Sequence, residues 1–183
     1  MMRVDFGAFR VQSGPMPFSD HLPRVALVLA VCAALPSAAP AQPAALGFDP
    51  VAFFSGETTG KGRLKKIMSS AQATHVTGRG RVEGGVLVLD QSVTITGEPR
   101  RERQWRLRPL SPTYWAGTLS DARGPVNATA TGRVLTIAYT SNDGMGITQT
   151  VTLAGDGQSA RNLMRVRKFG MTVATLDETI TRN

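Results

Sequence analysis

Short stretches in which apolar and polar side chains alternate, separated by glycine-containing turns, fill the chain from residue 58 to its end. In one stretch Leu87 and Leu89 would share a face, and in another Leu135, Ile137 and Tyr139 would do so. A period of two residues is typical of a strand with one buried face. We therefore predict strands at residues 58–68, 71–81, 86–96, 101–110, 114–121, 125–130, 133–140, 147–153, 160–167 and 171–181.

The connections between these strands are short turns, such as residues 83–85 and 142–144, which join antiparallel neighbours. A sheet of that many strands twists, and closing it into a barrel removes its exposed edges. We therefore predict an all-β fold, an antiparallel up-and-down barrel of about eight to ten strands. Its interior would be filled by side chains or hold one small ligand. A two-sheet sandwich is the alternative that the same pattern leaves open.

A short helix is predicted before the first strand, over residues 48–54. Asp49 can accept hydrogen bonds from the free N–H groups at the start of a helix, and Pro50 suits the first helical position. A glycine follows the segment and would end it. We expect Phe53 and Phe54 to pack onto whatever lies beneath this helix.

An uncharged apolar run over residues 25–35 follows Arg24 near the start of the chain. This run is shorter than the roughly 20 residues that a helix needs to cross a bilayer. Residues 39–41 (APA) then have the small-x-small pattern of a cleavage site. We therefore predict a signal peptide at residues 1–41, a folded domain at 42–183, and a periplasmic or secreted protein.

The single cysteine, Cys32, lies within the apolar run. A lipoprotein would have a small residue before it, whereas this chain has the bulky Val31, so we do not expect lipid anchoring at Cys32. Cleavage after Ala41 would leave the mature chain without cysteine, which suits an oxidising compartment. Met16 is an alternative translation start to Met1, because the segment before Met16 is long and of mixed polar and apolar character for the start of a signal peptide.

One cysteine and two histidines exclude most zinc sites and any intramolecular disulfide. His21 lies in the predicted signal peptide, which leaves His75 on a predicted strand. No pattern matches a catalytic constellation, so we predict no enzymatic activity, no metal and no cofactor. A catalytic role would require His75 to meet a carboxylate within about 3 Å. Asp90, Asp121 and Asp177 are the candidates, although such residues more often lie at barrel rims or pair with arginines.

The chain carries 21 basic and 13 acidic residues, a net charge of +8. Basic residues concentrate at 61–66, 100–108 and 165–168, and alternation places Arg103 and Trp105 on one face of the second stretch. Because we predict export, nucleic acid is not an expected partner. The expected partners are an anionic head group, a fatty-acid carboxylate or an anionic membrane surface. Each basic residue near an anionic surface adds about 1 kcal/mol of binding free energy. A solvated basic exterior is the alternative.

Three groups of residues form a pattern along the chain. The first is residues 48–56 (FDPVAFFSG) with residues 59–62 (TGKG). The second comprises Trp105, residues 114–117 (YWAG), Asp121, Gly124 and Ala128, and the third combines Asn162 with residues 168–170 (KFG). With this pattern the chain resembles, over about residues 48–182, a family of exported bacterial proteins. Many members are lipoproteins, and the family is grouped as a domain of unknown function with a lipocalin-like barrel.

The resemblance implies a lipocalin-like barrel and a small-molecule or lipid-related role, because relatives tend to be encoded beside lipid-modifying enzymes. It implies no catalytic residues. The chain departs from the family pattern at residues 154–157 (AGDG), which replace an aromatic-acidic stretch, and at Val166, where methionine is usual. The lipidated cysteine of the family also has no clear counterpart. These departures weaken the expectation of membrane anchoring and of a binding site shared with the family more than they weaken the expected fold.

We therefore expect a lipocalin-like protein that binds a small apolar or amphipathic anionic, lipid-like molecule in its barrel. The expected ligand-binding residues are Arg103, Trp105, Trp115, Tyr139 and Arg165. The alternative is a non-catalytic envelope interaction or assembly module whose barrel is filled by side chains. A further alternative is a lipid-modifying hydrolase or isomerase that uses His75.

Overall fold

The structure, a computed structural model, describes residues 47–183. It consists of one short helix, α1 (Pro50–Phe54), and ten strands. The strands are β1 (Gly56–Lys66), β2 (Gln72–Glu83), β3 (Val86–Ile95), β4 (Arg101–Ser111), β5 (Tyr114–Leu119), β6 (Val126–Thr131), β7 (Val134–Thr140), β8 (Gly146–Leu153), β9 (Ser159–Lys168) and β10 (Met171–Arg182). Every predicted strand is confirmed, with ends that differ by at most two residues. The predicted signal peptide and Cys32 lie outside the described residues.

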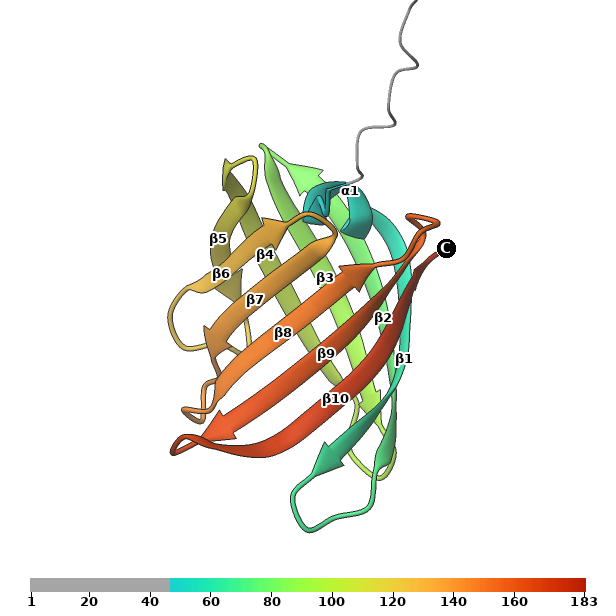
Figure 1. Cartoon of the computed structure of the whole chain (residues 1–183), viewed down its shortest axis with the longest axis vertical. Coiled ribbons are helices and arrows are strands. Elements are labelled where there is room, and N and C mark those ends of the chain that lie inside the picture. The colour runs from blue at the N-terminus through green and yellow to red at the C-terminus, as the bar shows by residue number, and fades with distance from the viewer. Residues whose placement is uncertain (1–46) are drawn as a thin grey trace, which may run out of the picture. The chain divides into compact units, whose positions relative to one another are not determined.

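The ten strands form a single closed antiparallel barrel (Figure 1). Each strand pairs with the next one along the chain, and β10 closes the ring by pairing with β1 from Thr58↔Arg182 to Lys66↔Ala174. This closure leaves no exposed edge strand in the sheet. The predicted up-and-down barrel is therefore confirmed, and the sandwich alternative is wrong. Among residues 47–183, no helix has the length and apolar character needed to cross a bilayer.

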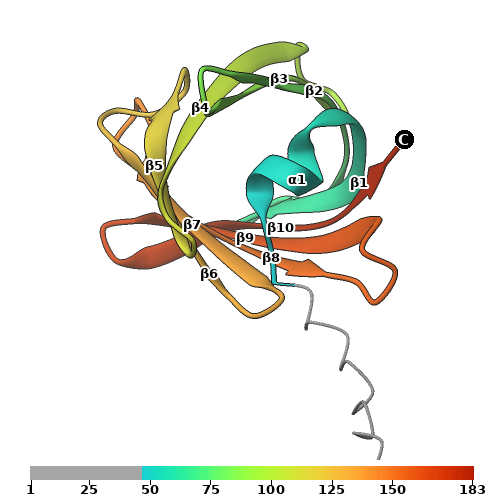
Figure 2. The same ribbon diagram turned by 90° about the horizontal axis from the view of Figure 1, so that it is seen from above.

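Helix α1 lies within the ring of strands at one end of the barrel (Figure 2). Its start is the one predicted: the Asp49 carboxylate accepts a hydrogen bond of 2.8 Å from the Val51 N–H, and Pro50 occupies the first turn. The helix packs directly on β2, where a Cβ atom at Gly80 would lie 1.8 Å from the Phe54 carbonyl oxygen. Only glycine fits at that contact.

Three phenylalanines fill the end of the barrel that α1 occupies. The rings of Phe48 and Phe53 have centroids 5.3 Å apart, and those of Phe53 and Phe54 are 4.9 Å apart and edge-on. Inward-facing side chains of the strands complete this core: Leu87, Leu89, Trp105, Leu107, Trp115, Leu119, Val126, Ala128, Ala130, Leu135, Ile137, Tyr139, Val151, Leu153, Ala160 and Ile180. The apolar core therefore extends from the α1 end toward the middle of the barrel.

Candidate functional site

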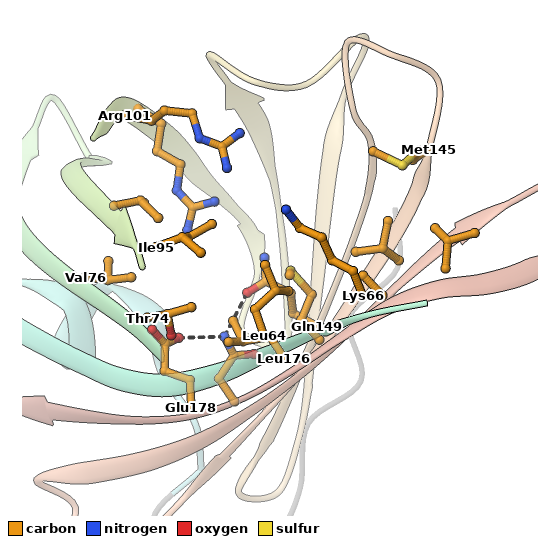
Figure 3. A pocket seen from close by; sticks show the side chains of 17 residues that line it. Leu64, Lys66, Thr74, Val76, Ile95, Arg101, Met145, Gln149, Leu176 and Glu178 are labelled. Atoms are coloured by element: carbon orange, nitrogen blue, oxygen red, sulfur yellow. Dashed lines mark hydrogen bonds between the residues drawn. The ribbon is translucent and has the colours of Figure 1, made fainter. Parts of the chain in front are cut away.

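The barrel interior at the end opposite α1 contains a cavity of about 310 Å³ (Figure 3). Its walls are mainly apolar, and the apolar lining residues come from five strands and the β7–β8 loop: Leu64, Val76, Val93, Ile95, Met145, Met164, Val166, Val173, Ala174 and Leu176. Small-molecule sites in proteins typically measure about 300–1,000 Å³, so this cavity suits a small ligand. A second hollow of about 480 Å³ adjoins it at the rim and shares Arg101, Arg103 and Met145 with it.

A row of buried polar side chains crosses the interior at the base of the cavity, one from each of β7 to β10. The Asn162 amide N–H₂ donates to Glu178 Oε2 at 3.0 Å and to Gln149 Oε1 at 3.2 Å (Figure 3). Gln149 Nε2 in turn donates to the Tyr139 hydroxyl at 3.4 Å. All four residues are less than 9% exposed. This row, named here the polar floor, separates the cavity from the apolar core.

Glu178 is a carboxylic acid at the base of a largely apolar cavity. Burial raises the pKa of its carboxyl, against the hydrogen bond from Asn162 and the positive charge of Arg103, both of which lower it. Its Oε1 atom, Asn162 Oδ1 and Thr74 Oγ1 have no hydrogen-bond partner among the described residues. Buried polar atoms are ordinarily paired, so the polar floor has capacity to bind a further polar group.

Three basic side chains, Lys66, Arg101 and Arg103, line the cavity toward its mouth (Figure 3). Lys66 and Arg101 both form ion pairs with Glu98, the latter at 3.4 Å, and the Lys66 ammonium lowers the pKa of the Glu98 carboxyl. Arg103 has no ion pair with any carboxylate of residues 47–183. Its guanidinium charge is therefore the one most available to an anion.

Arg103, Trp105 and Tyr139, three of the five expected ligand-binding residues, lie together. The Arg103 Nε and Trp105 Nε1 groups both donate to Gln91 Oε1, at 2.9 and 2.7 Å. The Arg103 guanidinium lies 5.5 Å from the centroid of the Trp105 ring, which meets Tyr139 edge-on at 5.6 Å. Arg103 lines the cavity and Tyr139 the adjoining hollow, whereas Trp105 supports both from the core side.

The other two expected ligand-binding residues do not line the cavity. Trp115 is buried in the core, because β5 begins at the end of the barrel that α1 fills. Arg165 is exposed on the outer face of β9, because Asn162, Met164 and Val166 occupy the inward positions of that strand. The expectation that these two side chains contact a ligand in the barrel is therefore corrected.

The residues considered for catalysis lie outside the cavity. His75 is exposed on the outer face of β2, so the hydrolase or isomerase that relied on His75 has no support from its position. Asp90 bonds to Arg81 and Gln104, and Asp177 bonds to Arg161 at 2.7 Å, while Asp121 lines the rim hollow. Among residues 47–183 no three His, Cys, Asp or Glu side chains converge as a metal site would require.

The sequence analysis did not single out three of the four residues of the polar floor: Glu178, Asn162 and Gln149. A signal for each exists in the alternation. Glu178 shares the inward face of β10 with Leu176 and Ile180, so it interrupts an apolar row. Asn162 and Gln149 interrupt the inward rows of β9 and β8 in the same way. A polar residue in phase with buried neighbours on three consecutive strands indicates an internal polar cluster.

The solved structures that match this chain include the following two. The S-type phycobiliprotein lyase CPES from Guillardia theta aligns with a TM-score of 0.59 and 6% identity over 73% of this chain and 90% of that chain. EF1p2_mFAP2b bound to DFHBI aligns with a TM-score of 0.40 and 10% identity over 73% and 96%. The likeness to the lyase shows the fold alone and confirms the predicted lipocalin-like barrel.

None of the curated proteins matches the chain. The sequence pattern predicted a domain of unknown function that spans nearly all of the folded part. The model of one such family, described as "Protein of unknown function (DUF3833)", matches residues 26–182. The match covers most of the sequence, so the chain belongs to this family.

Proposed function

We propose that the barrel binds a small amphipathic molecule with an anionic group, of the kind found in lipids. The apolar part of the ligand occupies the cavity of about 310 Å³, and its anionic group lies at the mouth beside Arg101 and Arg103. The observation that carries the proposal is this combination of an apolar interior with basic side chains around its opening. Burial of apolar ligand surface contributes about 25 cal/mol for each Å², and the arginines add charge-assisted hydrogen bonds.

Arg103 is the principal anchor in this proposal. Its Nε–H bond to Gln91 and its position over Trp105 fix the guanidinium in one orientation, so little rotamer freedom is lost when an anion binds. The remaining N–H groups of the guanidinium are suited to a carboxylate or phosphate, which they can bind in a bidentate manner. Arg101 and Lys66 are partly neutralised by Glu98 and contribute less.

The polar floor limits how deeply an apolar chain can enter. A chain that reached Glu178 and Asn162 would cover polar atoms without giving them hydrogen bonds, which is unfavourable by about 1–3 kcal/mol for each group. A short chain, or one that ends in a hydroxyl or carbonyl group, avoids this cost. The ligand class that fits best is therefore a short amphipathic anion, with an additional polar atom at its far end as the favoured variant.

The alternative, an assembly module with a filled barrel, requires side chains to occupy the interior along its whole length. The α1 end meets that requirement, but the cavity at the opposite end does not, so ligand binding is the better supported function. We further propose that the protein acts after export, in the periplasm or outside the cell. The predicted signal peptide supports this, and N-terminal sequencing of the protein recovered from outside the cytoplasm tests it: a start at Gln42 is expected, and an intact N-terminus would contradict export.

The binding proposal is tested with 11-(dansylamino)undecanoate, a fluorescent fatty acid, and its displacement by decanoate, decanol and decyltrimethylammonium. We expect decanoate to displace the probe best, because it is the only anion among the three competitors. Ala174→Trp fills the cavity from β10 and is expected to abolish probe binding. Thr175→Trp places the same side chain on the outer face of that strand and is the matched control. Arg103→Gln is expected to weaken decanoate binding about tenfold and to leave decanol unchanged.

Two results would overturn the proposal: no saturable binding of either the probe or decanoate to the wild-type protein, the latter followed by titration calorimetry, or equal decanoate binding to the Ala174→Trp and Thr175→Trp variants. Native mass spectrometry after gentle purification gives an independent reading, since a co-purified amphipathic anion would appear as an added mass that the Ala174→Trp variant lacks.

A further inference from the structure

The four most exposed large apolar side chains among residues 47–183 lie on two hairpin tips at the open end of the barrel. Ile67 and Met68, at the β1–β2 tip, are 64% and 99% exposed. Phe169 and Met171, at the β9–β10 tip, are 89% and 66% exposed. We call these four residues the apolar tips. Figure 1 shows both hairpins at the end of the barrel opposite α1.

The two hairpins are neighbours in the barrel. β1 pairs with β10 as far as Lys66↔Ala174, and the Ile67 N–H then donates to the Val173 carbonyl oxygen at 2.8 Å. Val173 and Lys66 also line the cavity, so the apolar tips project beyond its mouth on one side. A surface that contacts both tips therefore lies next to the entrance of the cavity.

The backbone at each tip is unusual. Met68 and Phe169 have φ angles of 58° and 50°, and they are the only two non-glycine residues with positive φ among those described. This left-handed conformation favours glycine or asparagine and costs other residues about 1–2 kcal/mol. Both tips thus carry a large apolar side chain, in water, at the position where glycine would be more favourable for folding. Such strain is concentrated at functional positions.

Basic residues flank both apolar tips in the sequence. Lys65 and Lys66 precede the first tip, Arg167 and Lys168 precede the second, and neither residues 61–71 nor residues 163–176 contain an acidic residue. Glu98 in the β3–β4 loop pairs with Lys66 at the rim, and Asp121 and Asp143 line the adjoining rim hollow. Positive charge and exposed apolar surface therefore coincide on the β9, β10 and β1 side of the opening.

We propose that the apolar tips insert into the surface of a lipid bilayer that contains anionic lipids. Apolar side chains flanked by lysine and arginine are the composition that binds such interfaces, because burial of the apolar groups adds to electrostatic attraction by the head groups. The bilayer is the committed partner because its two properties, an apolar layer beneath a negative surface, match the two properties of the tips. Docking in this way places the cavity mouth at the membrane, where amphipathic anions reside.

The proposal is tested by sedimentation of the full chain with vesicles of phosphatidylcholine, with and without roughly 30% phosphatidylglycerol. We expect binding to the anionic vesicles that weakens several-fold when salt rises from about 0.1 to about 0.5 M. The variant Met68→Ser/Phe169→Ser is expected to bind at least tenfold more weakly. The control Val82→Ser/Leu110→Ser removes two exposed apolar side chains near the α1 end of the barrel and is expected to bind like the wild type.

A second measurement reports contact at the tip itself. In a Phe169→Trp variant, lipids brominated on their acyl chains are expected to quench the added fluorescence, whereas a Leu110→Trp variant at the α1 end shows no added quenching. Both variants carry the same N-terminal residues, so membrane attachment through residues 25–35 would not produce the difference. Equal binding of the tip and control double variants, or equal quenching at positions 169 and 110, would overturn the proposal.

Membrane docking and ligand binding can be tested independently of each other. Met68→Ser/Phe169→Ser leaves the cavity lining unchanged, so it is expected to bind the dansyl probe in solution like the wild type. Loss of vesicle binding with normal probe binding supports docking by the tips. Absence of vesicle binding by the wild type, with probe binding intact, removes the docking proposal and leaves the proposed function in place.

Discussion

The Glu178 side chain on β10 occupies space beside the neighbouring strand β1, and this space exists because residue 60 is glycine. A Cβ atom at Gly60 would lie 2.4 Å from Glu178 Oε1 and 2.8 Å from its carboxyl carbon. Gly60 and Glu178 lie on the paired strands β1 and β10, where Gly62 is the register partner of Glu178. The glycines of β1 therefore make room for the buried carboxyl at the polar floor.

Substituting Gly60 by alanine tests this relationship. Replacing glycine by alanine within a strand ordinarily stabilises a protein by about 0.5–1 kcal/mol, but here the added methyl group overlaps the carboxyl group. We expect Gly60→Ala to lower the free energy of unfolding by about 1–3 kcal/mol in urea titrations. Gly155→Ala, where no atom lies within 4 Å of the added Cβ, should change it by about 0.5 kcal/mol or less. A Gly60→Ala effect that persists when Glu178 is also alanine would contradict this explanation.

The stability of the protein should depend on pH through Glu178. Burial raises the pKa of this carboxyl above its ordinary value of 4.5. Between the ordinary value and the raised one, the folded protein keeps a proton that the unfolded chain releases, so stability falls as pH rises through that window. Glu178→Gln stays neutral and should be more stable than the wild type at pH 7.5. The difference should disappear in unfolding experiments near roughly pH 4.

Asp177, the adjacent residue, provides a control of opposite sign. The hydrogen bond and charge of Arg161 lower the pKa of Asp177 on the outer face of β10. Asp177→Asn should therefore be slightly less stable than the wild type at pH 7.5 and approach it as pH falls through the ordinary carboxyl range. If Glu178→Gln and Asp177→Asn shift stability in the same direction at pH 7.5, the assignment of a raised pKa to Glu178 is wrong.

Gln91 should matter for both stability and ligand binding. Its Oε1 atom accepts hydrogen bonds from the buried Trp105 N–H and from Arg103. Gln91→Met keeps the side-chain size but leaves the Trp105 N–H without a partner, so we expect a loss of about 1–3 kcal/mol in the free energy of unfolding. Decanoate binding should weaken several-fold because Arg103 is no longer oriented. Gln104→Met, which removes a bond to Asp90 on the outer face, is the control and should leave decanoate binding unchanged.

The left-handed tip at Met68 predicts opposite effects on stability and on membrane binding. Met68→Gly removes the cost of the left-handed conformation, which is about 1–2 kcal/mol for a residue with a side chain. Glycine loses more backbone entropy on folding than other residues, and this loss offsets part of the gain. We expect a net gain of about 0.5–1 kcal/mol in the free energy of unfolding. Vesicle sedimentation should weaken, because an apolar side chain is removed. Ile67→Gly, one residue earlier and not left-handed, should instead lower stability.

The ten strands could be predicted from the sequence because side-chain alternation and turn glycines are local signals. The inward phase of β4 was also accessible, since Trp105 and Leu107 lie on the same face as Arg103 and mark it as the buried one. In β9 the phase was ambiguous. Leu163 shares a face with Arg165 and Arg167, and Asn162 shares the other with Met164 and Val166, so neither face is purely apolar.

The position of Trp115 depended on a relationship that alternation does not contain. An inward tryptophan lines a cavity at one end of the barrel and joins the core at the other, and the difference is set by the end that α1 fills. That choice follows from tertiary contacts such as the packing of Phe54 on Gly80. The same holds for Glu178: its phase is visible in the sequence, but the space that Gly60 provides requires the pairing of the first and last strands.

The packed phenylalanines at the α1 end have a kinetic consequence for the barrel formed by residues 47–183. Because packed side chains fill the α1 end, a molecule bound in the cavity would enter and depart at the end opposite α1. An incoming molecule therefore cannot push out the resident one from behind, and exchange passes through an empty state. The rate of replacement is then limited by departure and does not rise with the concentration of the competitor.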